Sequence, residues 1–193
     1  METIRLYAKN FSRYFDLGYF KRFILILLAF YYANLLFIAI ANPQGPLYNA
    51  FMYENLHYAN WLRASILHTA NVFSHFLGLD SYIADPKIIA VENGRSLLMA
   101  RQCLGLEIMG FWAAFVIAHK ASWKKKLAWT LGGMFVIWFI NCWRVSVLLY
   151  ALQNNWKALN TIDHHDTFNY IAYGIVILMI ILYNRQEKVA NPA

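Results

Sequence analysis

Residues 99–107, Met-Ala-Arg-Gln-Cys-Leu-Gly-Leu-Glu, join a polar segment of the chain to an apolar one. Before them, residues 82–98 contain turn pairs and short β-prone runs, which predict a β-hairpin. After them, residues 104–123 are long and apolar enough for a membrane-spanning helix. Cys103 is therefore expected at a boundary between water and lipid, beside a helix N-terminus whose N–H groups favour a thiolate. A small packing residue is the alternative, because free cysteines more often fill gaps than act as nucleophiles.

The composition of the whole chain indicates an integral membrane protein. Of 193 residues, 60% are hydrophobic and only 14% are charged, which is more apolar than a soluble domain normally is. The net charge is +7, but the basic residues lie beside apolar runs instead of forming a stripe, which argues against nucleic-acid binding. Cys103 and Cys142 have neither a CxxC nor a zinc-type spacing. His68 and His75 share a helix face but have no further ligand at helical spacing, so packing histidines are favoured over a metal pair.

Apolar runs divide the chain into segments of a single membrane domain. The predicted segments are a cytoplasmic N-terminus (1–22), a first span (23–41), an outer segment (42–103), a second span (104–123), a third span (127–151), an outer loop (152–166) and a fourth span (167–183). Polar residues within 47–79 predict amphipathic helices at the outer surface, and a crossing there would invert the orientation of every later segment. The predicted fold is thus an all-α integral membrane protein of about four transmembrane helices, with outer amphipathic helices and a short β-hairpin before Cys103.

The distribution of basic residues supports this topology. With both termini and the basic loop 120–126 on the cytoplasmic side, 11 of the 17 Lys and Arg residues lie there, as the positive-inside rule requires. Residues 42–103 and 152–166 then face the same outer compartment.

An arginine stands within the third predicted span. Arg144 follows Asn141 by three residues, so the two side chains share a helix face. A charge within a span costs roughly 2.5–3.5 kcal/mol on insertion scales, which makes such residues functional candidates. Arg144 also lies about two turns from the outer end of its span, from where it can extend to the lipid headgroups. Both interpretations stay open at this level.

Three kinds of reactive side chain fall at the outer ends of neighbouring predicted spans. They are Cys103, Arg144 and the histidines of the segment Asp163-His164-His165-Asp166. Together they suit acyl transfer: cysteine attacks a carbonyl, histidine moves the proton and arginine stabilises the developing negative charge. On a helix beginning near Asp163, His165 shares a face with Asn169 and is the preferred proton shuttle. Taken alone, the histidine segment is an N-cap with a solvated loop.

Three motifs succeed one another along the second half of the chain. They are Cys103-Leu104-Gly105, a Cys-x-Gly pattern; Asn141-Cys142-Trp143-Arg144, an Asn-x-x-Arg pattern; and His165-Asp166 before an apolar span. In this order they resemble the exosortase/archaeosortase family of membrane transpeptidase-like enzymes, most closely its short members from Bacteroidetes-type bacteria. The resemblance implies Cys103, Arg144 and His165 as catalytic residues. It also implies Asn141, Asp166 and Gly105 as supporting residues, while Leu104 replaces a serine usual in the family.

The resemblance also implies a function. Such an enzyme cleaves secreted proteins at a C-terminal sorting tail, made of a short motif, a transmembrane helix and a basic end, through a cysteine thioester. It then transfers them to an acceptor such as a lipid or a glycan, needs no metal or organic cofactor, and works in the bacterial inner membrane with its active site facing the periplasm. A non-catalytic assembly or scaffold subunit is the alternative, although such a subunit needs no Cys, Arg and His on one side.

Overall fold

The computed structural model describes residues 16–156 and 164–190. Within these ranges it describes no side chain for Gln102, residues 164–169 or residues 187–190. In chain order the elements are α2 (Leu17–Ile40), α3 (Ala50–Asn55), α4 (Tyr58–Phe76), β1 (Ser81–Asp85), β2 (Ile88–Val91), β3 (Ser96–Leu98), the 3₁₀ turn η1 (Arg101–Leu104), α5 (Leu106–Ala118), α6 (Trp123–Gln153) and α8 (His164–Ala190). The protein is therefore mainly helical, with one small antiparallel sheet.

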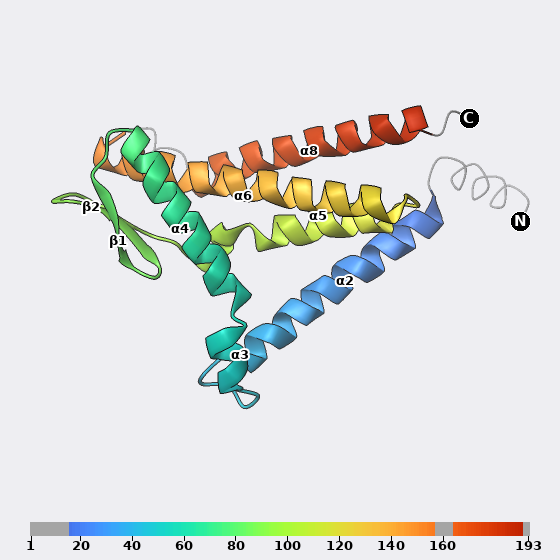
Figure 1. Cartoon of the computed structure of the whole chain (residues 1–193), viewed down its shortest axis with the longest axis horizontal. Coiled ribbons are helices and arrows are strands. Elements are labelled where there is room, and N and C mark those ends of the chain that lie inside the picture. Colours follow the sequence, from blue (N-terminus) through green and yellow to red (C-terminus); the bar gives the residue numbers. More distant parts are fainter. Residues whose placement is uncertain (1–15, 157–163, 191–193) are drawn as a thin grey trace, which may run out of the picture.

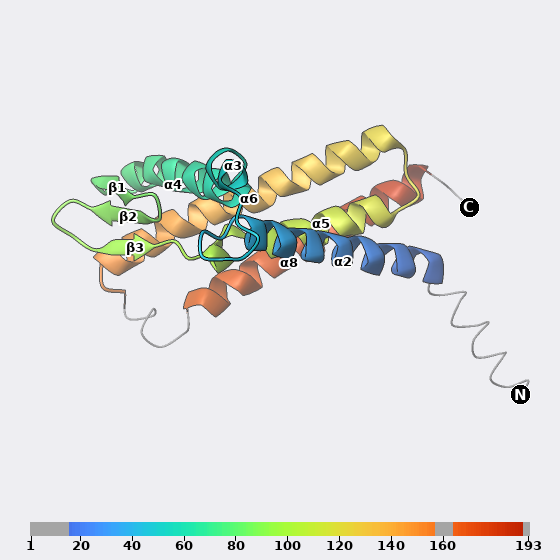
Figure 2. The same ribbon diagram turned by 90° about the horizontal axis from the view of Figure 1, so that it is seen from below.

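The helices form a bundle that carries the sheet at one end (Figures 1 and 2). The axes of α5, α6 and α8 are roughly aligned with one another, and α6 returns antiparallel to α5. Helix α2 packs against α5, and α4 lies across α6. The sheet and α4 lie toward the end where α5 begins and α6 ends. The start of α2, the α5–α6 connection and the end of α8 lie at the other end. These three parts carry the described basic residues that were expected on one side of a membrane, and they share one end of the molecule.

Side-chain hydrogen bonds hold the helices together at that basic end. Arg22 Nε donates to the carbonyl oxygen of Ala118 at 2.9 Å, which joins α2 to α5. Trp129 Nε1 donates to Gln186 Oε1 at 3.2 Å, which joins α6 to α8. Arg22 thereby satisfies one of the carbonyl oxygens that have no hydrogen-bond partner within α5 at its C-terminal end.

The first apolar helix begins six residues before the predicted start of the first span at residue 23. Asp16 is its N-cap, and its Oδ1 atom accepts hydrogen bonds from the N–H groups of Gly18 and Tyr19 at 2.9 and 3.1 Å. A capping aspartate satisfies N–H groups that the first turn of a helix leaves unpaired. The prediction followed the apolar run alone and so missed this start.

The helix in the second predicted span, residues 104–123, is shorter than that span. Gly105 has φ +71°, in the left-handed region, so the helix begins only at Leu106, and His119 adopts an extended conformation that ends it after Ala118. The resulting 13 residues rise about 20 Å, which is less than the roughly 30 Å of a hydrocarbon core.

The other two predicted spans are longer in the structure. Helix α6 already begins at Trp123, inside the basic loop predicted at 120–126, and Lys126 Nζ donates to the carbonyl oxygen of Ile117 at 2.9 Å. Lysine is a good helix former, and this contact also satisfies a C-terminal carbonyl of α5. Helix α8 begins at His164, inside the predicted outer loop 152–166.

Two of the described helices, α2 and α6, are long and apolar enough to cross a membrane. Helix α5 and residues 170–186 of α8 are apolar but shorter. Length and composition therefore support two of the four predicted crossings, and the other two stay a prediction.

The predicted β-hairpin is instead a three-stranded antiparallel sheet in the order β1-β2-β3. Strand β2 is central and pairs Val91 with Ser81 and Ile88 with Leu98. The turn after β2 contains Asn93 at φ +52°, a conformation that asparagine tolerates better than most residues. This second turn returns the chain along β2 and brings β3 directly to η1, so the sheet fixes the position of the Cys103 turn.

Helices are present in the segment 47–79, as predicted. One face of α4 is buried, with Ile66 and Ala70 fully enclosed, and it packs against α6. Ser146 Oγ of α6 donates to the carbonyl oxygen of Ala70 at 2.8 Å. His68 and His75 lie on the exposed side of α4. The core between α4, the sheet and α6 therefore supports the turn that carries Cys103.

Gly133 controls how closely α5 and α6 approach. A Cβ at this position would collide with the indole ring of Trp112, whose Nε1 atom donates to the carbonyl oxygen of Trp129 at 2.9 Å. We expect Gly133→Ala to lower the stability by roughly 1–3 kcal/mol, as overpacking does. Thermal unfolding of the purified protein in detergent measures this. Gly132→Ala is the matched control, because a Cβ there meets no described atom within 4 Å; equal melting temperatures for the two variants would contradict the packing.

Candidate active site

Cys103 lies in η1, the short turn between the sheet and α5. It is half-buried and forms no disulfide, and its N–H group donates to the carbonyl oxygen of Ala100 at 3.1 Å. Its side chain packs at the edge of the core formed by α4, the sheet and α6. Cys103 thus lies where the polar segment passes into an apolar helix, and its place at a boundary between water and lipid stays a prediction. A half-buried thiol keeps access to a reaction partner, which a packing residue does not need.

The Cys-x-Gly and Asn-x-x-Arg motifs meet in the structure. Asn141 of α6 is buried, and its Nδ2 atom donates a long hydrogen bond of 3.4 Å to the carbonyl oxygen of Leu104. A Cβ on Gly105 would collide with this same Nδ2 atom. Glycine is therefore required here twice, for its positive φ and for the close approach of Asn141. The contact holds the Cys103 turn against α6.

Gly105→Ala should disturb this turn. A non-glycine residue in the left-handed region costs roughly 1–2 kcal/mol, and the collision with Asn141 adds to that. We expect a lower melting temperature and an altered rate of Cys103 labelling by a thiol reagent. Gly110→Ala serves as the control, since a Cβ at Gly110 meets no described atom within 4 Å and alanine favours a helix. Unchanged labelling and stability in Gly105→Ala would contradict this account of the motif.

Arg144 lies one helical turn beyond Asn141 on α6. Only 8% of its surface is exposed, so its side chain is enclosed by the protein. This burial argues against the interpretation in which Arg144 extends to the lipid headgroups. Burying a cation is costly unless other groups compensate its charge. A buried arginine within a predicted span is therefore a candidate for a role in function.

Cys142 lies beside Asn141 but faces the protein core. It is completely buried, in the same core cluster as Leu104 and Leu149. A small buried thiol of this kind packs as an apolar side chain. The two cysteines thus differ in access: Cys103 is half-buried and Cys142 is enclosed.

His165 and Asp166 stand at the start of α8, where only the backbone is described. Their side chains lie outside the described part of the chain, and so does Asp163. The start of α8 lies toward the same end of the bundle as η1, and α8 packs against α6 (Figures 1 and 2). The structure therefore brings together Cys103, Gly105 and Asn141, and leaves the position of the His165 ring as a prediction.

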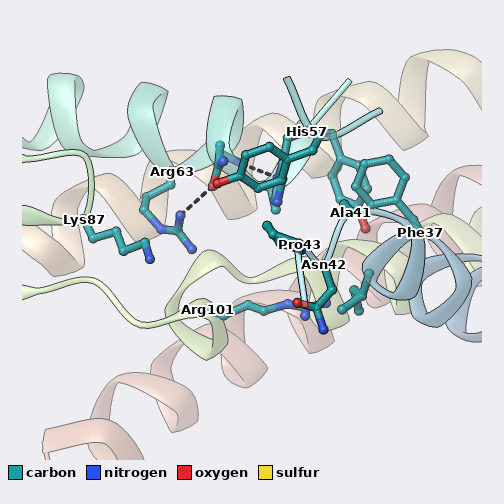
Figure 3. A pocket seen from close by; sticks show the side chains of 13 residues that line it. Phe37, Ala41, Asn42, Pro43, His57, Arg63, Lys87 and Arg101 are labelled. Carbon is teal, nitrogen blue, oxygen red and sulfur yellow. Dashed lines mark hydrogen bonds between the residues drawn. The ribbon is translucent and has the colours of Figure 1, made fainter. Parts of the chain in front are cut away.

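A pocket of about 350 Å³, which was not predicted, lies beside η1, the turn that contains Cys103 (Figure 3). It lies between the end of α2, the start of α4, the β1–β2 turn and η1, and Arg63, Lys87 and Arg101 line it. These three cations come from distant parts of the sequence. Arg63, a charged residue in an otherwise core-facing position of α4, is the one signal that could have indicated it.

A comparison with known families matches most of the chain. The family model described as transmembrane exosortase matches residues 17–182, a range that includes η1, Asn141 and Arg144. No curated protein matches the chain, and no solved structure does. The family match extends well beyond the three motifs and includes α2, α4 and the sheet. The chain therefore belongs to the transmembrane exosortase family.

Proposed function

We propose that this protein is a membrane cysteine transpeptidase that removes C-terminal sorting tails from secreted proteins. Membership in the exosortase family supports a membrane enzyme of the cysteine-peptidase type. The observation that carries the proposal is the contact between Asn141 and the backbone of the Cys103 turn, because it joins the two sequence motifs into one site.

The proposed reaction has two steps. In the first, the Cys103 thiolate attacks the carbonyl carbon of the scissile peptide bond, and Arg144 stabilises the negative charge on the oxygen. The C–N bond breaks, His165 gives its proton to the leaving amine, and a thioester with Cys103 remains. In the second, a nucleophilic group of the acceptor gives its proton to His165 and attacks the thioester; the C–S bond breaks, which releases the Cys103 thiolate and leaves His165 protonated for the next cycle. Asp166 orients His165 or caps α8, and Asn141 and Gly105 hold the turn.

We infer four membrane crossings, by α2, α5, α6 and α8. The basic end of the bundle would lie in the cytoplasm, and the sheet, α3 and α4 would lie on the periplasmic side of a bacterial inner membrane. Because α5 rises only about 20 Å from that basic end and a hydrocarbon core is roughly 30 Å thick, Cys103 would lie in the outer half of the membrane.

This topology predicts opposite accessibility for two positions. An accessibility tag inserted near Gly94, in the turn between β2 and β3, should react with a membrane-impermeant reagent added to the periplasmic side. A tag near Lys125 should react only when the reagent reaches the cytoplasm. If both tags react on one side, or the two sides are exchanged, the catalytic residues no longer face the compartment in which secreted proteins are found.

The function is tested by comparing the C-termini of secreted proteins in cells with and without this protein. We expect proteins that carry a short motif, a transmembrane helix and a basic end to lose this tail only when the protein is present. The measurement is mass spectrometry of their C-terminal peptides, combined with fractionation into anchored and released proteins. If no C-terminus and no anchoring changes, the proposal fails in favour of a non-catalytic assembly or scaffold subunit.

A further inference from the structure

The pocket beside η1 is lined by three cations, by other polar side chains and by apolar groups. Arg63 of α4, Lys87 of the β1–β2 turn and Arg101 of η1 enter it from different sides (Figure 3). Among the described residues, no Asp or Glu lines it. Its volume is about 350 Å³, more than a single carboxylate needs and within the usual range of small-molecule sites. Three positive charges at one opening attract an anion.

Arg63 is the strongest sign that an anion is required. Its side chain is only 8% exposed, and its Nη1 atom donates to Asn60 Oδ1 at 2.8 Å. Its buried Nε atom has no hydrogen-bond partner among the described residues. A buried cation with an unsatisfied donor costs several kcal/mol unless a counter-charge is bound. A bound anion would satisfy both the charge and the donor.

The electrostatic surroundings of the pocket agree with this interpretation. Burial lowers the pKa of His57, which also lines the pocket, and the positive charges of the three cations lower it further. Burial likewise lowers the pKa of Arg63, and the nearby charge of Arg101 adds to this effect. The cations therefore act on one another and on His57 without a carboxylate between them.

Two asparagines of the pocket are also placed to donate. Asn60 uses its side-chain oxygen for Arg63, and Asn42 uses its side-chain oxygen for the N–H group of Gln44 at 3.2 Å. Each asparagine is left with its NH₂ group. Arg101 makes one long contact of 3.5 Å with Asn34 Oδ1 on α2 and is otherwise exposed. Arginine and lysine side chains with added amide donors are typical of sites that recognise phosphate oxygens.

The opposite wall of the pocket is apolar and continues into the surface of α2. Phe37, Ile38 and Ala41 form this wall at the end of the helix. Helix α2 has no buried residue along its whole length, and Leu35 and Leu36 are 42% and 56% exposed. A ligand with a charged head and hydrocarbon chains can therefore place its head among the cations and its chains along α2. A free anion without hydrocarbon chains would make no favourable contact with the apolar wall.

We propose that this pocket binds the phosphate group of an anionic phospholipid headgroup. The three cations hold the phosphate oxygens, the asparagine amides bind the remaining polar groups of the head, and the acyl chains lie on α2. The proposal concerns binding alone and does not depend on the proposed catalysis. It places a lipid head beside Arg101, which stands two residues before Cys103 in η1.

Binding to the purified full-length protein in an uncharged maltoside detergent tests this proposal. Native mass spectrometry is carried out with dioctanoyl phosphatidylglycerol, and no peptide substrate is present, so the result does not depend on catalysis. We expect one lipid per chain. Lys87→Gln and Arg101→Gln should each weaken binding about tenfold, because each removes one charged donor. Both residues are exposed, so these variants should fold even where Arg63→Gln does not.

The control variant and three other probes separate the alternatives. Arg95→Gln removes an exposed cation from the turn between β2 and β3, outside the pocket, and should bind the lipid like the wild type. The proposal is overturned if Lys87→Gln and Arg101→Gln also bind like the wild type. It is overturned as well if dioctanoylglycerol, which lacks phosphate, or inorganic phosphate, which lacks acyl chains, binds as tightly as the phospholipid. Binding of an acidic peptide but not of the lipid would assign the pocket to a protein carboxylate and would likewise overturn it.

Discussion

Replacing Cys103 by alanine is expected to abolish the removal of C-terminal tails, because without this thiol no thioester can form. Loss of a catalytic nucleophile costs on the order of 10⁴-fold or more in rate, so no product should appear on a practical timescale. Cleavage of an exported reporter that carries a native sorting tail measures the effect.

The chain offers its own control for this experiment. Cys142 is the other cysteine in the sequence, and it is completely buried in the core, whereas Cys103 is half-buried. Cys142→Ala should therefore cleave the reporter nearly as fast as the wild type. A thiol reagent should label Cys103 in the folded protein and leave Cys142 unlabelled until it unfolds. Equal loss of cleavage in both variants would point to the fold instead of the nucleophile.

His165→Ala should lower the rate of tail removal by roughly 10²–10⁴, the usual cost of losing a general acid–base. His164→Ala should have a small effect, because on α8 the two neighbouring side chains point about 100° apart. Asp166→Asn should leave the helix start intact and weaken the orientation of His165. The reporter assay measures all three variants.

The choice between the two histidines depends on where α8 begins. The backbone starts the helix at His164, so His165 lies in its first turn. If cleavage survives His165→Ala but not His164→Ala, the roles of the two rings are exchanged. If it survives both, histidine does not move the proton.

The sequence predicted the helices well where apolar residues dominate. The runs in α2 and α6 are long, and burial in a bilayer or a core requires such residues regardless of detail. It failed at the helix ends, which depend on local contacts: the Asp16 cap lengthens α2, and the left-handed Gly105 shortens α5. The third strand was missed since three residues are too few for a clear alternating pattern.

The candidate site was predictable where its parts lie close together in sequence. Cys103 and Gly105 belong to one turn, and Asn141 and Arg144 to one helix face, so spacing alone related each pair. The hydrogen bond from Asn141 to the Cys103 turn joins segments 37 positions apart and had no signal in the spacing. The pocket around Arg63 likewise depends on the packing of α2, α4 and η1, which only the folded chain brings together.

The most direct test of the account is to identify the covalent intermediate on Cys103. The protein is incubated with a secreted substrate whose tail it removes, denatured with acid, digested and analysed by mass spectrometry. The account predicts that the new C-terminus of the substrate is joined to the peptide containing Cys103 by a bond that hydroxylamine cleaves, in the wild type and in Cys142→Ala. Tail removal by Cys103→Ala at the wild-type rate, or an adduct on another residue, would contradict it.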